Sequence, residues 1–98
     1  MPYTLLYHPS VAEEDLPQVP LNIQHRIARA IASRLASAPE QQGAPLKGTL
    51  KGYWKLRVGD YRVIYKIGRG EVWILGIIHR NQVCGDILKR ILWRPPLK

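Results

Sequence analysis

Four cationic side chains stand inside the stretch GYWKLRVGDYRVIYKI, residues 52–67, which is otherwise rich in the aromatic and β-branched residues typical of strands. They are Lys55, Arg57, Arg62 and Lys66. Charged groups are almost never buried without a partner, so these side chains must face either water or something negatively charged. Grouped lysines and arginines are suited to binding phosphate oxygens and to stabilising negative charge that grows on them during a reaction.

Alternation along a strand places all four cations on one face of a sheet. The apolar residues of the same two strands share the opposite face: Trp54, Leu56, Val58, Tyr61, Val63, Tyr65 and Ile67. A tight turn at Gly59 and Asp60 would join the strands as a hairpin, so that the cations of both strands lie on one open surface. Arg80 ends the next predicted strand and would reach the same surface.

This cationic surface has an ordinary explanation and a functional one. Solvated polar positions are normal on the outer face of an antiparallel sheet. However, like charges on neighbouring strands repel one another, and residues 47–80 contain only Asp60 and Glu71 to offset them. Because the arrangement lowers stability, we expect a polyanion to bind there.

The distribution of charge along the chain supports the same expectation. The 98 residues include fifteen Lys and Arg against seven Asp and Glu, a net charge of +8. Residues 1–46 carry a net charge of −1, residues 47–80 carry +6 and residues 81–98 carry +3. A positive field concentrated in the second half suits nucleic acid, an acidic protein or an anionic membrane.

Several classes of protein are disfavoured. Cys84 is the single cysteine, so no intramolecular disulfide forms and a cysteine-rich zinc site is not expected. The first fifteen residues lack the pattern of a signal peptide, and the longest apolar run, residues 72–78, is too short to span a bilayer. We therefore expect a cytoplasmic protein without a membrane partner.

The remaining segments predict the elements that hold the cationic surface. Strands are predicted at 3–8, 52–58, 61–67 and 71–79, helices at 9–19, 21–37 and 85–93, and a linker at 38–45. The last strand is apolar on both faces, which is typical of a central strand covered on both sides. The order predicts an α+β fold in a single domain over residues 1–98, with the helices on one face of a mainly antiparallel sheet.

Nearly the whole chain resembles a known family. PLKGTLKGYWKLRVGDYRVIYKI, EVWILGIIHR and DILKRI together resemble the RelE/ParE superfamily of toxins from type II toxin–antitoxin systems, and the RelE branch most. The resemblance implies a RelE-like, microbial ribonuclease-type fold: an N-terminal strand, two helices, a three-strand antiparallel meander and a C-terminal helix. It implies an mRNA interferase that needs neither metal nor another cofactor, cuts mRNA in the ribosomal A site and so inhibits translation. It also implies a cognate acidic antitoxin as partner, through which the toxin–antitoxin complex would bind operator DNA.

The resemblance also assigns roles to individual residues. Lys55 matches a functional lysine of the family and is a candidate for proton transfer or phosphate contact, Arg62 matches the arginine that stabilises the phosphate, and Arg80 matches the arginine assigned to phosphate or leaving-group work. These three are the candidate catalytic residues. The candidate RNA-binding residues are Lys51, Arg57, Lys66, His79 and Cys84. By alternation His79 would lie with Trp73, Leu75 and Ile77, so it is either an acid–base group or a structural residue.

Two departures from the family pattern leave alternatives open. Tyr53 stands where the best-known members carry a further lysine, for which Lys51 could substitute. Cys84 falls near the position of a tyrosine that many members use as a base or for stacking on an RNA base. It is therefore either an acid or base in its own right or a small buried residue.

Two other functions fit the same chain. A ParE-like protein would bind DNA gyrase without performing chemistry, and a toxin-fold basic module would bind its partner with little nuclease activity. The cationic set favours the nuclease, because a gyrase binder does not need it. All three readings predict an acidic antitoxin, one helix of which could occupy the apolar edge from Ile87 to Trp93.

Overall fold

A computed structural model describes residues 3–82 and 85–94, apart from the side chains of residues 85 and 86. The strands are β1 (Thr4–Tyr7), β2 (Ala44–Pro45), β3 (Trp54–Val58), β4 (Tyr61–Ile67) and β5 (Glu71–His79). The helices are α1 (Leu21–Ala30), α2 (Pro39–Gln42) and α3 (Gly85–Leu88), with π-helical stretches at Val11–Asp15 and Ile31–Leu35 and 3-10 turns at Leu16–Gln18 and Gly48–Leu50. Within the described residues, no helix combines the length and the apolar character needed to span a bilayer.

The five strands form one mixed sheet in the order β1-β5-β4-β3-β2. β1 runs parallel to β5, and every other neighbouring pair is antiparallel. The predicted α+β fold and its β3–β4–β5 meander are confirmed, and β5 is central as expected, since it lies between β1 and β4. The predicted linker at 38–45 is partly ordered instead, because it forms α2 and then adds the edge strand β2, with Ala44 opposite Lys55.

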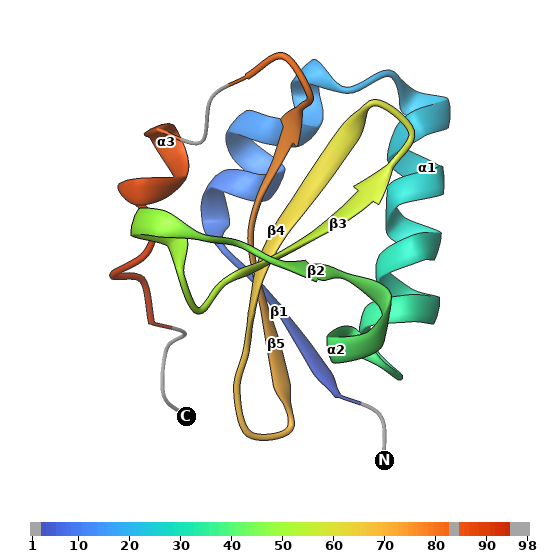
Figure 1. Ribbon diagram of the computed structural model, residues 1–98. Helices are drawn as coiled ribbons and strands as arrows, with labels where there is room; N and C mark the ends of the chain where they lie inside the picture. Colours follow the sequence, from blue (N-terminus) through green and yellow to red (C-terminus); the bar gives the residue numbers. More distant parts are fainter. Residues whose placement is uncertain (1–2, 83–84, 95–98) are drawn as a thin grey trace.

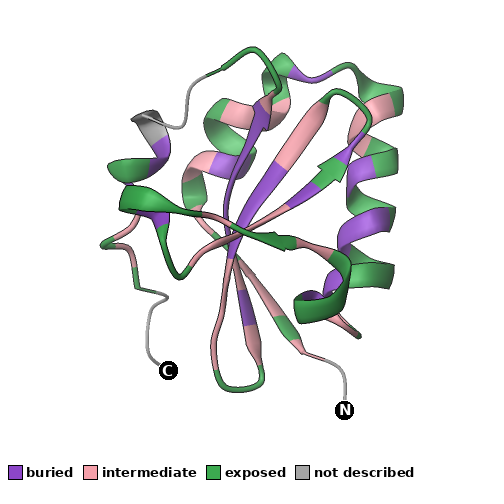
Figure 2. Cartoon of the chain, in the orientation of Figure 1, coloured by how far each residue is buried: buried purple, intermediate pink, exposed green. Residues whose placement is uncertain are grey.

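One side of the sheet packs against α1 and the π-helical stretch that continues it. Ile27, Ile31 and Leu35, spaced four residues apart, are buried against sheet residues that include Val63 and Tyr65. Figure 2 shows buried stretches on the helix and along β4 and β5. The amphipathic stripe predicted for this helix is therefore its core-facing side.

The other side of the sheet is covered in its middle by α3 (Figure 1). Ile87 of α3 packs with Leu50 and with Ile64 and Ile78 of the sheet, all of them buried. The expectation that every helix lies on one face is therefore wrong. Ile64 and Ile78 are apolar residues on the same face as the cations. Removing their side chains from water is favourable, and Ile87 and Leu50 pack over them.

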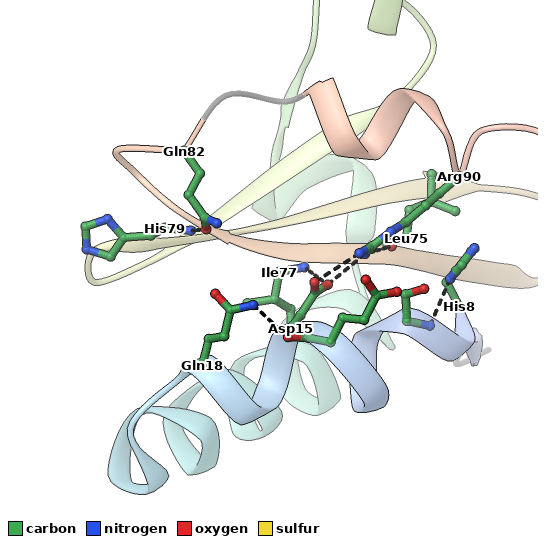
Figure 3. Close-up of polar contacts among 10 residues, drawn as sticks. His8, Asp15, Gln18, Leu75, Ile77, His79, Gln82 and Arg90 are labelled. Atoms are coloured by element: carbon green, nitrogen blue, oxygen red, sulfur yellow. Dashed lines mark hydrogen bonds and ion pairs between the residues drawn. The ribbon is translucent and has the colours of Figure 1, made fainter.

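A bulge in β5 links the sheet to both helical layers. Leu75 is the extra residue, because Ile64 pairs with Gly76 while the next residue, Tyr65, pairs with Ile74. The buried ion pair of Asp15 and Arg90 binds the backbone here: Asp15 Oδ2 accepts the Ile77 N–H at 2.9 Å, and Arg90 Nη1 donates to the Leu75 carbonyl at 2.9 Å (Figure 3).

The bulge also changes which side chains share a face. Across the ladder Trp73 lies opposite Lys66, on the cationic face, whereas Ile77 lies opposite Val63, on the α1 face. His79 was expected to lie with Trp73, Leu75 and Ile77. It shares a face with Ile77 but not with Trp73, because alternation fails at the extra residue Leu75.

Gly76 is expected to tolerate no larger residue. A Cβ at this position would collide with Ile87 Cδ1 and lie 2.8 Å from Arg90 Nη1. Gly76→Ala should therefore lower the free energy of unfolding by about 1–3 kcal/mol, the usual range for overpacking. Urea unfolding measures this, with Gly68→Ala as the control, since a Cβ there would meet only the Glu71 carbonyl at 3.8 Å. Equal losses in the two variants would contradict the steric account.

Tyr65 predicts a loss of stability in alkaline solution. Burial raises the pKa of Tyr65 to about 12, and its hydroxyl donates to the Pro39 carbonyl at 2.7 Å. Because the unfolded chain releases this proton near pH 10, the stabilisation is complete below about pH 10 and is lost between about pH 10 and 12, by about 1.4 kcal/mol per pH unit. Urea unfolding across this range should show a shallower pH dependence for Tyr65→Phe than for the wild type; equal slopes would exclude Tyr65 as the cause.

Candidate nucleic-acid interface

A small hollow on the cationic face contains four of the eight predicted site residues. Its volume is about 140 Å³, and its lining residues are Lys55, Arg57, Gly59, Asp60, Tyr61, Arg62 and Arg80. The β3–β4 hairpin supplies all of them except Arg80, which follows the last residue of β5. The three candidate catalytic residues and Arg57 are thus brought together by one hairpin and the strand beside it.

Strand register explains how these cations meet. Arg57 lies directly opposite Arg62 across β3 and β4, and Lys55 lies two residues earlier on the same face of β3. The Arg80 N–H donates to the Asp60 carbonyl at 2.8 Å, which ties the end of β5 to the hairpin turn. The hairpin and this turn contact therefore hold the basic groups on neighbouring, hydrogen-bonded backbone.

The hollow carries more positive than negative charge. Asp60 is the one acidic residue in its lining, and its Oδ1 lies 3.7 Å from Arg80 Nη1. Both side chains are largely exposed, 57% for Arg80 and 61% for Asp60, and ion pairs of this kind contribute little. Arg57 Nε donates to the Gly59 carbonyl at 3.3 Å, which leaves its terminal nitrogens for other partners. Such a site can bind oxyanions and stabilise charge that develops on them.

Lys66 shares this face but lies outside the hollow. Its Nζ is 5.8 Å from the ring centroid of Tyr53 and 5.4 Å from that of Trp73, within the range of cation–π attraction. Arg94 stacks over the same Trp73 at 5.7 Å. Lys66 is thus part of a stacked cationic and aromatic group beside the C-terminal segment.

His79 belongs to the α1 face of the sheet. Its ring meets Tyr61 edge-on, with centroids 5.1 Å apart, and its Nδ1 accepts the Asn81 N–H at 3.2 Å. Its own backbone N–H donates to Gln82 Oε1 at 2.6 Å (Figure 3). The structure therefore places His79 at the end of β5, on the face opposite to Lys55 and Arg62.

Of the two other predicted site residues, the structure describes only Lys51. Lys51 is exposed in the turn before β3 and is absent from the lining, and Cys84 lies outside the described residues. Among the side chains that the structure describes, no three His, Cys, Asp or Glu groups gather as a metal site would need. From the sequence, Asp60 was expected as a turn residue and as one of two acids that offset the cations, and Tyr61 was expected in the apolar set. Neither was predicted to line the site.

Two groups with displaced pKa values lie at the end of β1. Burial raises the pKa of Tyr7. Burial also lowers the pKa of His8, the Arg90 charge lowers it further, and Asp15 opposes both effects. The Ser10 N–H donates to His8 Nδ1 at 3.0 Å, a contact that requires this nitrogen to be unprotonated (Figure 3). Neither Tyr7 nor His8 lines the cationic hollow, and burial is the main cause of both shifts.

The fold and its cationic hollow define a small, basic α+β protein, and comparison with known proteins gives its family. The family model that describes the ParE toxin of the type II toxin–antitoxin system parDE matches residues 5–84. Toxin RelE of Mycobacterium tuberculosis (strain ATCC 25618 / H37Rv) is 34% identical over 80 residues, covering 76% of this chain and 82% of the relative. Toxin RelG of the same organism is 32% identical over 85 residues, covering 85% and 97%.

Solved structures agree with these relatives. The toxin–antitoxin complex RelBE2 from Mycobacterium tuberculosis matches with a TM-score of 0.75 at 30% identity, covering 84% of this chain and 95% of that chain. The RelB–RelE antitoxin–toxin complex from Methanococcus jannaschii matches with a TM-score of 0.61 at 22% identity, covering 88% and 98%, and shows the shared fold. The chain therefore belongs to the RelE/ParE family of toxins of type II toxin–antitoxin systems.

Proposed function

We propose that this toxin is a metal-independent endoribonuclease that cuts mRNA in the ribosomal A site and thereby stops translation. The observation that carries the proposal is the hollow in which Lys55, Arg57, Arg62 and Arg80 converge around a single carboxylate. Three cations on the paired strands β3 and β4, with Arg80 directly after β5, form a preorganised site for the phosphate of an RNA chain. The similarity to the RelE and RelG toxins supports the same class of activity.

The proposed reaction uses the RNA's own 2′-hydroxyl. The 2′-oxygen attacks the adjacent phosphorus and forms a bond to it while the bond from phosphorus to the 5′-oxygen breaks, leaving a cyclic phosphate and a free 5′-hydroxyl. Lys55 is assigned to removal of the 2′ proton or to phosphate contact, and Arg62 to the non-bridging oxygens. Arg80 is assigned to the phosphate or the leaving 5′-oxygen, which also takes up a proton. Arg57 adds positive potential at the phosphate.

An acidic antitoxin is the proposed inhibitor. The relatives of known structure include toxin–antitoxin complexes, and the charge of this chain favours an acidic partner. The C-terminal segment also exposes two leucines, Leu88 at 40% and Leu92 at 82%, that an amphipathic antitoxin helix would cover. Operator DNA would be bound by the complex through the antitoxin.

Inhibition of DNA gyrase is the second candidate, because the matching family model is that of a ParE toxin. The two functions make different demands on the chain. The nuclease needs Lys55, Arg62 and Arg80 at the reacting phosphate, whereas a gyrase inhibitor can act without them.

Two assays separate these functions. Primer extension on an mRNA translated in a purified system should show breaks at fixed positions within codons, and Lys55→Ala, Arg62→Ala and Arg80→Ala should each weaken them. A supercoiling assay with purified gyrase should show no inhibition. Intact mRNA together with inhibited gyrase would replace the first function by the second, and breaks that survive all three substitutions would overturn the site.

A further inference from the structure

A second basic hollow lies between α1 and the β3–β4 turn. Its volume is about 370 Å³, and its lining residues are Arg26, Arg29, Ala30, Ser33, Arg34, Arg57, Val58 and Gly59. Four of these eight are arginines, and none is acidic. Among the side chains that the structure describes, the two ion pairs are Arg80–Asp60 and Arg90–Asp15, so no described carboxylate pairs with Arg26, Arg29 or Arg34.

The helix presents these arginines beside its core stripe. Arg26, Arg29 and Arg34 are exposed, while Ile27, Ala30 and Ile31 face the sheet. Arg26 and Arg29 are three residues apart, a spacing at which like charges on a helix repel and lower its stability. The Ser33 hydroxyl donates to the Arg29 carbonyl at 2.8 Å, so it is already engaged with the helix backbone. An anion bound among Arg26, Arg29 and Arg34 would therefore stabilise this part of the protein.

The second hollow continues into the first. Arg57 and Gly59 line both of them. Gly59 adopts a φ of +60°, which favours glycine, and even a Cβ there would come within 3.8 Å of Arg26 Nη1. The turn therefore separates the two hollows without a side chain at Gly59. Arg26 lines the second hollow, Arg62 lines the first, and Arg57 lines both.

The chemistry of the second hollow favours a phosphate chain over an acidic helix. All its cations are arginines, whose planar guanidinium groups match phosphate in a bidentate way. Its apolar lining consists of Ala30 and Val58, whereas an amphipathic helix needs a hydrophobic groove for its anchors. We propose that Arg26, Arg29 and Arg34 bind backbone phosphates of the same RNA strand whose scissile phosphate lies in the first hollow. This inference rests on the proposed function for the identity of that strand.

The test measures binding to RNA that cannot be cut. Fluorescence anisotropy with 2′-O-methyl single strands of about 4 and about 12 nucleotides, at several salt concentrations, reports affinity for a short and a long site. In Arg26→Gln/Arg29→Gln/Arg34→Gln, binding of the long strand should weaken and its salt slope should fall by about 2, since each lost phosphate contact removes about 0.7. Binding of the short strand should stay within about twofold of the control. That control is Lys47→Gln/Arg69→Gln/Lys89→Gln, which removes three exposed positive charges outside both hollows.

Each outcome decides the inference. Loss confined to the long strand, with a thermal midpoint equal to that of the control, supports it. Equal affinities and slopes in the two triple variants overturn it, and so does an equal loss for both strand lengths. Unchanged RNA binding with loss of binding to a poly-glutamate peptide would assign the hollow to an acidic protein instead. Because the RNA cannot be cut, this binding result does not depend on the primer-extension result. RNA binding by Arg26, Arg29 and Arg34 can therefore be refuted without refuting the nuclease, and the nuclease can be refuted without refuting the binding.

Discussion

Arg62→Gln is expected to lower the rate of mRNA cleavage by about 10²–10³-fold, the usual effect of removing one preorganised donor from a reacting oxyanion. Arg62 lies in the hollow beside Lys55 and Arg80 and directly opposite Arg57. Glutamine keeps much of the side-chain length but removes the charge and the guanidinium fork. Primer extension in the purified translation system measures the rate. Arg62→Lys should recover only part of it, since lysine restores the charge without the fork.

Stability distinguishes this catalytic assignment from a structural one. Like charges directly opposite on neighbouring strands are destabilising, by up to about 1 kcal/mol. Arg62→Gln removes the repulsion from Arg57, so its free energy of unfolding should equal or exceed that of the wild type. Arg69→Gln, in the exposed turn between β4 and β5, is the matched control and should change neither quantity. A cleavage rate that falls only in proportion to lost stability would mean that Arg62 supports the fold rather than the reaction.

The local sequence pattern was sufficient to predict that the cations of the β3–β4 hairpin share one face. Lys55, Arg57 and Arg62 alternate with apolar residues that need a core, and the Gly59-Asp60 turn fixes the register of the hairpin. Lys66 obeys the same alternation yet lies outside the hollow, between Tyr53 and Trp73. Alternation determines the face of a sheet, but it carries no information about which part of that face a helix will cover.

The features that the sequence did not predict depend on contacts between distant segments. Arg26, Arg29 and Arg34 have the pattern of a solvated helix face, and their proximity to Gly59 arises only when α1 packs on the sheet. The bulge at Leu75 depends on Asp15 and Arg90, which are 75 residues apart in the chain. In the sequence Asp15 is one acid after Glu13 and Glu14, and nothing in that run indicates that it is the one that is buried.

Membership of the RelE/ParE family does not decide whether the target is mRNA or DNA gyrase. The matching family model is that of a ParE toxin, whereas the relatives at 34% and 32% identity are a RelE and a RelG toxin. One fold can carry different activities, so the residues that would touch a substrate are the better guide. Here the hollow brings together Lys55, Arg62 and Arg80, the residues that the proposed nuclease reaction needs, which is why the nuclease is proposed first.

Asp15→Asn is expected to lower the free energy of unfolding by about 3–5 kcal/mol, the usual cost of leaving a buried charge without its partner. Both side chains of the pair are about 10% exposed. Asp15 Oδ2 accepts from Arg90 Nη1 at 2.8 Å, and Oδ1 accepts from Nη2 at 3.1 Å. Asparagine keeps the shape but removes the charge that balances the guanidinium. Since small domains are stable by only about 5–15 kcal/mol, urea unfolding followed by tryptophan fluorescence should show a large shift of the midpoint.

The second ion pair of the described structure provides the control for Asp15. Asp60→Asn makes the same chemical change in the exposed pair with Arg80, and there the loss should be below about 1 kcal/mol. Arg90→Met should remove most of the penalty of Asp15→Asn, because the unbalanced charge is then gone, and the double-mutant cycle should give a coupling energy of about 1–3 kcal/mol. A loss in Asp15→Asn as small as that in Asp60→Asn would refute the buried pair. The bulge of β5 and the seating of the segment after α3 would then have to be held by the apolar contacts of Ile87 instead.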